Sequence, residues 1–380
     1  MKPLEMIESL VQFNTVSKES NLPLIEFVES YLNDFGIQSH RVPNDDGKKT
    51  NIYATIGPEE EGGVVLSGHT DVVPTDGQDW NTDPFRPVVA DKKLYGRGTC
   101  DMKGFIGTVL ALIPEMKQLS RPIHIALSYD EEIGCLGAPR MIDQLSKNIP
   151  RPEAVIVGEP TQMAAIAGHK GMVTLKTVVR GFETHSSQTH RGVSAVMTAA
   201  RLVEYLSAMA EKLANETTRD NGFEPHHTTI HVGVIRGGTA INIVSRHCEF
   251  LWDIRCIPND DPQTVIDEFN SFCLSEILPA MKSRNPKCFV ETKVTATAPP
   301  FFAEESPAVA LVEALTGLSS GSHAPYVAEA GQFQAAGFST VVCGPGSIDQ
   351  AHQPNEFISM AQIDGGEIFI RKLIDYLSYK

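Results

Sequence analysis

The feature that most constrains the fold is a series of short apolar runs separated by segments of helical spacing. The runs NIYATIG, GGVVLSGH, PIHIALSYD, AVIVGE and STVVCGPG have the character of buried strands, and FIGTVLALIPEM between two of them has that of a helix. Residues 4–13, 23–34 and 309–317 also have helical spacing. This alternation predicts an α/β fold with a mixed, largely parallel sheet flanked by helices.

The middle of the chain follows a different pattern. MVTLKTVVRG, TTIHVGVIRGG, EFLWDIRCIP and CFVETKVTAT are expected strands, while SAVMTAARLVEYLSAMAEKL and PQTVIDEFNSFCLSEILPAM are expected helices. Their order, βαββαβ, is that of a ferredoxin-like α+β unit. Because 380 residues exceed what one hydrophobic core usually serves, we expect two domains. Residues 1–172 and 298–380 form the first, and residues 173–297 are inserted into it.

Composition excludes several classes of partner. A formal net charge of -15 argues against nucleic acid or an anionic membrane, since both are polyanions. Glu5 and Glu8 interrupt the apolar core that a signal peptide would need, and no later stretch reaches membrane-spanning length. The seven cysteines lack CxxC spacing and fit reduced thiols better than disulfides. We therefore expect a cytoplasmic protein.

Residues of the types that commonly bind metals follow the apolar runs. His69 ends one run, Glu131 and Glu132 follow the next, and Glu159 follows a third. His352 lies a short loop beyond the last run. In open α/β sheets, ligands bind outside the carboxyl ends of the strands, so these side chains are expected to meet in one crevice.

Asp101 belongs to the same group because it opens the helix that leads back into the sheet. With it, the set holds two imidazoles and several carboxylates but no thiolate, a composition that suits zinc, cobalt or manganese. We interpret the neighbouring Cys100 as a bystander. Two metals roughly 3.5 to 4 Å apart need a bridging carboxylate and one or two terminal ligands each, and this set provides them.

Each of these residues also has an ordinary structural interpretation. Taken alone, His69 is a turn residue, Asp101 a helix cap and Glu159 the end of a strand. Glu131 and Glu132 would be a solvated acidic pair. Their coincidence at the ends of apolar strands favours the metal site, because unpaired buried charge is costly unless a cation compensates it.

Five motifs together resemble one known family. "SGHTDVVP", "LYGRGTCDMKG", "DEEIG", "VGEPT" and "AHQPNE" are similar in order and spacing to the M20 family of dinuclear zinc amidohydrolases and peptidases. The resemblance covers essentially the whole chain, including the inserted domain. It implies a hydrolase of linear amides with two Zn²⁺ per subunit, for which Co²⁺ is a possible substitute.

The resemblance also implies a ligand set. His69, Asp101 and Glu159 would hold one metal, and Asp101, Glu132 and His352 would hold the other. Asp101 would then bridge the two ions.

Two further roles at this site follow from the resemblance. Asp71 would orient His69 from behind. Glu131 would be the general base that takes a proton from water and delivers it to the leaving amine. A cis peptide is expected after Asp101.

The inserted domain carries its own motif in RGFETHSSQTHRG. By resemblance, His185 would reach the active site of the partner subunit in a homodimer and donate to the oxyanion, with His190 as the second candidate. Alone, the motif is a helix-entry loop. Asn242 and Arg255 match family positions that contact substrate, and Arg255 could form a bidentate pair with an α-carboxylate. Their ordinary interpretations are a turn residue and a surface arginine.

Substrate choice depends on finer likeness. "FNTVSKESNLPLIEF", "GHKGM", "WDIRCIPNDDP" and "EAGQFQAAG" most resemble the family branch that deacetylates N2-acetyl-L-ornithine in arginine biosynthesis. Glu329 would meet the distal ammonium of such a substrate or serve as a fold-stabilising partner. Succinyl-diaminopimelate desuccinylases, general N-acyl amino acid hydrolases and dipeptidases share the metal constellation and remain alternatives.

The sequence disfavours two other classes of protein. A catalytically silent metal-binding homologue is disfavoured by the presence of Glu131 and His185. A dinucleotide-binding protein is disfavoured because GRGTCDMKG does not follow a strand with the required glycine spacing.

Overall fold

The chain divides into two compact units. The computed structural model describes residues 1–216, 221–303, 305–320 and 323–378. Unit 1 comprises Met1–Gly168, Phe301–His323 and Ala328–Lys380, and unit 2 comprises His169–Pro300 and Ala324–Val327. The domain boundaries expected from the sequence lie a few residues from these. The grouping of Ala324–Val327 with unit 2 was not predicted.

Unit 1 is built on a six-stranded mixed sheet. Its order is β1 (Ser39–Pro43), β2 (Thr50–Ile56), β6 (Ile123–Ser128), β3 (Val64–His69), β7 (Ala154–Val157) and β14 (Thr340–Val342). Strand β3 runs parallel to β6 and β7, and β14 runs parallel to β7. The β1–β2 and β2–β6 pairs are antiparallel. The predicted largely parallel sheet is therefore confirmed.

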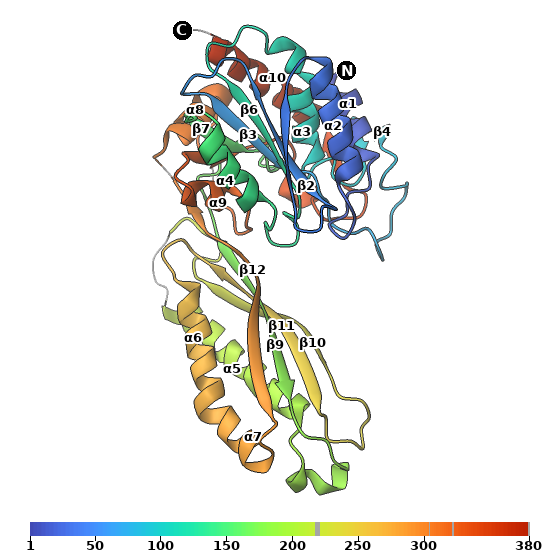
Figure 1. Ribbon diagram of the computed structural model, residues 1–380, viewed down its shortest axis with the longest axis vertical. Helices are drawn as coiled ribbons and strands as arrows, with labels where there is room; N and C mark the ends of the chain where they lie inside the picture. The colour runs from blue at the N-terminus through green and yellow to red at the C-terminus, as the bar shows by residue number, and fades with distance from the viewer. Residues whose placement is uncertain (217–220, 304, 321–322, 379–380) are drawn as a thin grey trace. The chain divides into compact units, whose positions relative to one another are not determined.

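Helices cover both faces of this sheet (Figure 1). One face packs against α1 (Pro3–Val11), α2 (Leu22–Asp34), α3 (Lys103–Ala111), α8 (Pro307–Thr316) and α10 (Met360–Ser378). The other face packs against α4 (Ala138–Asn148) and α9 (Ala330–Ala335).

Burial on both faces explains why the strands are continuous apolar runs. In β3, Val64 and Leu66 join the first core cluster, whereas Val65 joins the second. Polar and apolar residues do not alternate in such a strand, because neither of its faces is exposed to solvent. His69 is the last residue of the strand.

Smaller elements complete unit 1. A second sheet has the order β15 (Phe357–Ser359), β5 (Lys93–Tyr95) and β4 (Val88–Ala90). It pairs Tyr95 with Phe357 and so joins two segments far apart in sequence. Two 3₁₀ turns are η1 (Ile113–Glu115) and η4 (Ile348–Gln350). Short strands β8 (Gly168–His169) and β13 (Phe301–Phe302) lie where the chain passes from one unit to the other.

Unit 2 has the ferredoxin-like arrangement that the sequence predicted. Strands β9 (Gly171–Arg180), β10 (Thr229–Gly237), β11 (His247–Cys256) and β12 (Phe289–Ala298) form an antiparallel sheet in the order β10-β11-β9-β12. Helices α5 (Ala195–Glu216), α6 (Pro262–Phe272) and α7 (Leu278–Arg284) share one core with one face of this sheet (Figure 1). The short helix η2 (Ser186–Arg191) precedes α5.

The single helix expected over residues 262–281 is wrong in detail. A π-helical segment, η3 (Cys273–Ile277), separates α6 from α7. Pro279 lies at the start of α7, where its ring and missing N–H disturb the preceding helical turn.

Among the helices described, none combines the length and apolar character needed to cross a membrane.

Candidate metal centre

Three parallel strands deliver acidic and imidazole side chains to one edge of the sheet. His69 is the last residue of β3, and Glu159 lies two residues beyond the end of β7. Glu131 and Glu132 follow the end of β6 by a short turn. Because these strands are neighbours and run in the same direction, their carboxyl ends meet at this edge.

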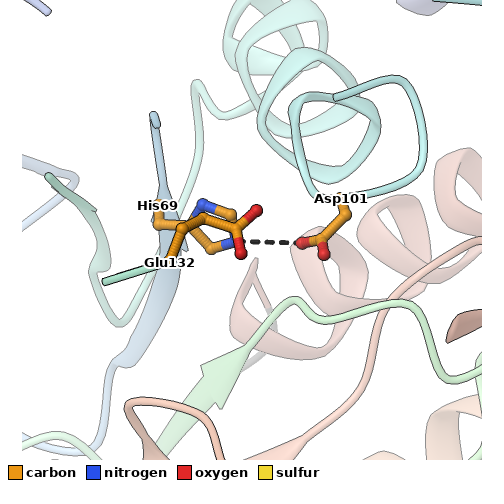
Figure 2. Close-up of side chains that lie close together, drawn as sticks. All are labelled: His69, Asp101 and Glu132. Carbon is orange, nitrogen blue, oxygen red and sulfur yellow. Dashed lines mark hydrogen bonds and ion pairs between the residues drawn. The ribbon is translucent and has the colours of Figure 1, made fainter. Parts of the chain in front are cut away.

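The first group of predicted ligands surrounds His69. Its Nε2 atom lies 2.9 Å from Asp101 Oδ1 and 3.9 Å from Glu159 Oε1. All three side chains are buried, with exposed fractions of 7% or less. Figure 2 shows Asp101 approaching His69 from a different segment of the chain, the loop that precedes α3.

The second group surrounds His352. Its Nε2 atom lies 3.2 Å from Asp101 Oδ2 and 2.9 Å from Glu132 Oε2. Asp101 therefore presents one carboxylate oxygen to each imidazole, as a bridging ligand would. His69, Asp101 and Glu132 each offer a ligand atom within 4.8 Å of the other two (Figure 2). The structure thus brings all five predicted ligands together.

The charge balance of this cluster fits divalent cations. Within the described residues, the ion pairs of Asp101, Glu132 and Glu159 are made to histidines and to no lysine or arginine. Burial raises the pKa of Glu131 and Glu159 well above their ordinary value, and burial with the nearby charge of Asp101 raises that of Glu132 to about 7. These carboxylates repel one another, so metal ions would relieve a real electrostatic cost.

The carboxylates in turn raise the pKa of both imidazoles. Hydrogen bonds with Asp101 and Glu132 raise the pKa of His352 to about 10. Burial acts to lower the pKa of His69, but Asp101, Glu159 and Glu131 overcome it and raise the value well above normal. Because a metal binds neutral imidazole, metal binding at this cluster would release protons.

Asp71 touches several members of the site. His69 Nδ1 donates to the main-chain oxygen of Asp71 at 2.9 Å, whereas the Asp71 carboxylate lies 3.7 Å from that nitrogen. The carboxylate instead accepts from the main-chain N–H groups of Glu131 and Glu132, at 3.1 and 3.3 Å, and from Ser17 Oγ at 2.7 Å. Asp71 therefore orients His69 through its backbone and positions the two glutamates through its side chain.

Glu131 has a partner that the sequence did not reveal. Its Oε1 atom accepts a hydrogen bond from the Cys135 thiol at 3.3 Å. Cys135 lies four residues later, directly after the DEEIG motif, and only the folded turn shows that its thiol points back. Cys100, by contrast, donates to the main-chain oxygen of Ser347. The peptide bond after Asp101 is cis.

Glu329 lies in the interior rather than at an open surface. Its carboxylate accepts hydrogen bonds from Ser67 and Ser128, and the side chain belongs to a residue only 1% exposed. Burial raises its pKa to about 7. These contacts match the fold-stabilising interpretation of Glu329 that the sequence left open.

The predicted histidine of unit 2 is exposed. His185 precedes η2, and its Nδ1 atom accepts a hydrogen bond from the main-chain N–H of Ser187 at 3.2 Å. The main-chain N–H of Ser186, the residue after His185, donates to the main-chain oxygen of Asn242. Two segments with predicted substrate contacts are therefore adjacent in this unit. His190 is exposed in the same short helix.

Arg255 lies on β11 and is half-buried. Its Nε atom donates to Asp253 Oδ2 at 2.9 Å, two residues away on the same strand. An acidic neighbour reduces the positive charge available to a substrate carboxylate. The proposed role of Arg255 thus depends on how this pair responds to a ligand.

Comparison with known proteins adds the family. Residues 65–376 match the family described as Peptidase family M20/M25/M40. The chain belongs to this family. Its membership confirms the resemblance drawn from the motifs, and with it the predicted class of amide-cleaving hydrolases.

Relatives and solved structures agree over nearly the full length. An acetylornithine deacetylase of Pasteurella multocida is 33% identical over 385 residues, which span 98% of this chain and 97% of the relative. An M20 family metallo-carboxypeptidase of Sulfolobus solfataricus shares the fold with a TM-score of 0.75 at 17% identity, covering 100% and 99% of the two chains. A Bacillus subtilis protein described as a dinuclear metal binding peptidase gives a TM-score of 0.64 at 14% identity, covering 99% and 97%.

Proposed function

We propose that this protein is a metal-dependent amidohydrolase that converts N2-acetyl-L-ornithine to L-ornithine and acetate in arginine biosynthesis. The observation that carries the proposal is the position of Asp101 between two imidazoles, each of which also faces a buried glutamate. The choice of substrate rests on the full-length similarity to relatives named acetylornithine deacetylase.

The ligand set proposed for the metals follows this geometry. His69, Asp101 and Glu159 would hold one divalent ion, and Asp101, Glu132 and His352 the other. Imidazole and carboxylate ligands suit Zn²⁺ and also Co²⁺. When bound, such ions supply a Lewis acid for the amide carbonyl and lower the pKa of water.

The protein's own groups would move the proton. Among the described residues, the Glu131 carboxylate accepts a hydrogen bond from the Cys135 thiol, whereas the Glu132 carboxylate pairs with His352. We propose that Glu131 accepts a proton from the attacking water and returns it to the amine nitrogen that leaves. The Asp71 carboxylate accepts from the main-chain N–H groups of both glutamates and so holds the backbone that carries the two side chains.

Unit 2 would complete the substrate site within a homodimer. We propose that His185 donates to the developing oxyanion in the partner subunit's active site, and that Asn242 and Arg255 contact the substrate. The adjacent positions of the His185 and Asn242 segments support a shared task. Seven free cysteines, all buried, are typical of a reducing compartment and support a cytoplasmic location.

A substrate panel tests the proposal. The metal-free protein, with and without added Zn²⁺ or Co²⁺, is assayed on N2-acetyl-L-ornithine, N-acetylmethionine, succinyl-diaminopimelate and a dipeptide. We expect metal-dependent turnover that is fastest on N2-acetyl-L-ornithine. Faster turnover of another compound would keep the metal centre and overturn the substrate, while inactivity on all four would contradict the enzymatic role.

A further inference from the structure

A buried carboxylate outside the predicted ligand set lies directly behind Asp101. Glu356 is 1% exposed and accepts four hydrogen bonds. Its Oε1 atom accepts from the main-chain N–H groups of Cys100 and Asp101, at 2.8 and 3.0 Å. Its Oε2 atom accepts from Arg97 Nη1 at 2.7 Å and from the main-chain N–H of Gly98 at 3.0 Å.

The donors all come from the loop that carries Asp101. Gly98 has a φ of +83°, a conformation that favours glycine. In this turn the N–H groups of Gly98, Cys100 and Asp101 point toward Glu356. The loop therefore wraps one carboxylate with three backbone donors and one guanidinium group. Without an acceptor, these buried donors would each pay a desolvation penalty.

A second chain of contacts leads from the same carboxylate to His352. Arg97, also 1% exposed, donates through Nη2 to Gln78 Oε1 at 2.6 Å. Gln78 Nε2 in turn donates to the main-chain oxygen of His352 at 2.9 Å. Glu356, Arg97 and Gln78 thus connect the Asp101 loop with the His352 loop.

The local fold explains why these two loops meet. Strands β5 and β15 pair directly, and the residues that follow β5 lie beside those that precede β15. The main-chain N–H of Gly96 donates to the main-chain oxygen of Glu356 at 2.9 Å and continues this pairing. The small sheet therefore brings the two loops together, and the Glu356 side chain fixes their detailed conformation.

We propose that Glu356 is a positioning residue of the metal centre, and that with Arg97 and Gln78 it fixes Asp101 and His352 relative to each other. This inference rests on the metal centre proposed above. Glu356 acts on Asp101 through its main-chain N–H, whereas Gln78 acts on His352 through its main-chain oxygen. Loss of Glu356 should therefore disturb both ions, since Asp101 is shared, and loss of Gln78 should disturb only the ion that His352 holds.

Because Glu356 only accepts hydrogen bonds, replacing it with Gln tests their contribution. In Glu356→Gln, one oxygen becomes an NH₂ group and must face two existing donors, either the pair on Oε1 or the pair on Oε2. Two buried N–H groups then lose their acceptor whichever way the amide turns. The side chain keeps its size, so the change tests hydrogen bonding rather than packing.

The experiment titrates metal-free protein with Co²⁺ and follows both calorimetry and the visible absorption of the bound ion. The variants are Glu356→Gln and Gln78→Met, the second at a half-buried position that should tolerate the change. Glu153→Gln is the matched control. Glu153 pairs with Arg121 at 2.6 Å but precedes β7, at the opposite end of that strand from Glu159.

We expect Glu356→Gln to weaken binding of both ions about 10- to 100-fold, the range typical of lost support behind a metal ligand, and to change the Co²⁺ spectrum. Gln78→Met should weaken one ion only, and Glu153→Gln neither. Unaltered affinities and spectra in Glu356→Gln and Gln78→Met would overturn the inference and leave the metal centre standing. Equal weakening by Glu153→Gln would also overturn it, because general destabilisation would then be the cause. A wild-type protein that binds no Co²⁺ would overturn both the inference and the proposed function.

Discussion

At the scale of single residues, two adjacent glutamates have different surroundings. Glu132 faces His352, whereas Glu131 accepts from the Cys135 thiol, and the backbone of both is held by Asp71. These surroundings support the proposed roles, in which Glu132 binds metal and Glu131 transfers the proton. Substitution of the two residues should therefore have different effects on metal binding and on activity.

Glu131→Gln should lower kcat by about 10²- to 10⁴-fold, since an amide cannot accept the proton from water. Both metal ions should remain bound, because Glu131 is outside the proposed ligand set. Steady-state kinetics and metal analysis of the same dialysed sample check both statements. Loss of an ion along with activity would show that Glu131 is a ligand instead.

His124 makes a separate contribution to stability. It is fully buried in β6, its Nδ1 atom lies 2.9 Å from Thr55 Oγ1, and burial lowers its pKa to about 4. The unfolded chain, with an ordinary histidine pKa near 6.5, therefore binds more protons between these values. Stability is fully present above pH 6.5 and is lost as the pH falls toward 4, by up to roughly 3 kcal/mol.

Replacing His124 with Asn should remove that part of the pH dependence. Urea unfolding of metal-free wild type and variant at several pH values between 7 and 4.5 measures it, because the difference between the two curves isolates residue 124. Parallel curves over this range would contradict the assignment of the loss to His124.

At the scale of elements, close packing beside the site depends on glycine. A Cβ atom on Gly158, at the end of β7, would lie 2.1 Å from Cδ1 of Phe105 in α3. Gly158→Ala should therefore destabilise the protein by about 1–3 kcal/mol, as overpacking of a core usually does. Gly365→Ala is a suitable control, since the nearest atom there is 3.7 Å away and the position is helical.

Urea unfolding of both glycine variants measures this difference. We expect Gly158→Ala to lower the midpoint and Gly365→Ala to leave it unchanged or raise it slightly, because alanine favours a helix. A stable Gly158→Ala protein would show that α3 can move away from β7 at little cost.

In unit 1, the strands that the sequence patterns predicted are those buried on both faces. Strands β3 and β6 appear as unbroken apolar runs, and the residues at their ends became the candidate ligands. Strands β4, β5 and β15 are only three residues long and partly exposed, so they leave no such pattern. The break at η3 was not predicted, because the helical periodicity of residues 262–281 continues through Pro279.

The hydrogen bonds that Asp71 and Glu356 make to the backbone near the ligands could not be predicted from the sequence, for a different reason. The resemblance named Asp71 as the partner of His69, but the hydrogen bonds to Glu131 and Glu132 depend on the conformation of the turn after β6. Glu356 stood in the quoted motif "AHQPNE" and was not singled out, because its four donors belong to a loop some 250 residues earlier. Spacing along the chain does not report such distant pairings.

At the scale of the whole molecule, the proposed homodimer predicts complementation between inactive subunits. Glu131→Gln and His185→Asn should each be nearly inactive alone. In a mixed dimer, the active site with an intact Glu131 would receive an intact His185 from the partner subunit, so one of the two sites would be complete. Random mixing should restore about a quarter of wild-type activity, since roughly half of the dimers are mixed.

The two variants are mixed after mild dissociation, reassociated and assayed. Unmixed samples carried through the same steps are the control. No recovery in a sample shown to contain mixed dimers would contradict the role given to His185 across subunits.

The central claim is that five side chains at one sheet edge hold two metal ions bridged by Asp101. Anomalous diffraction at the zinc edge, from crystals of the Zn²⁺-loaded protein, tests it most directly. We predict two peaks roughly 3.5 to 4 Å apart, with Asp101 between them, His69 and Glu159 on one, and Glu132 and His352 on the other. A single peak, or peaks away from Asp101, would contradict the account.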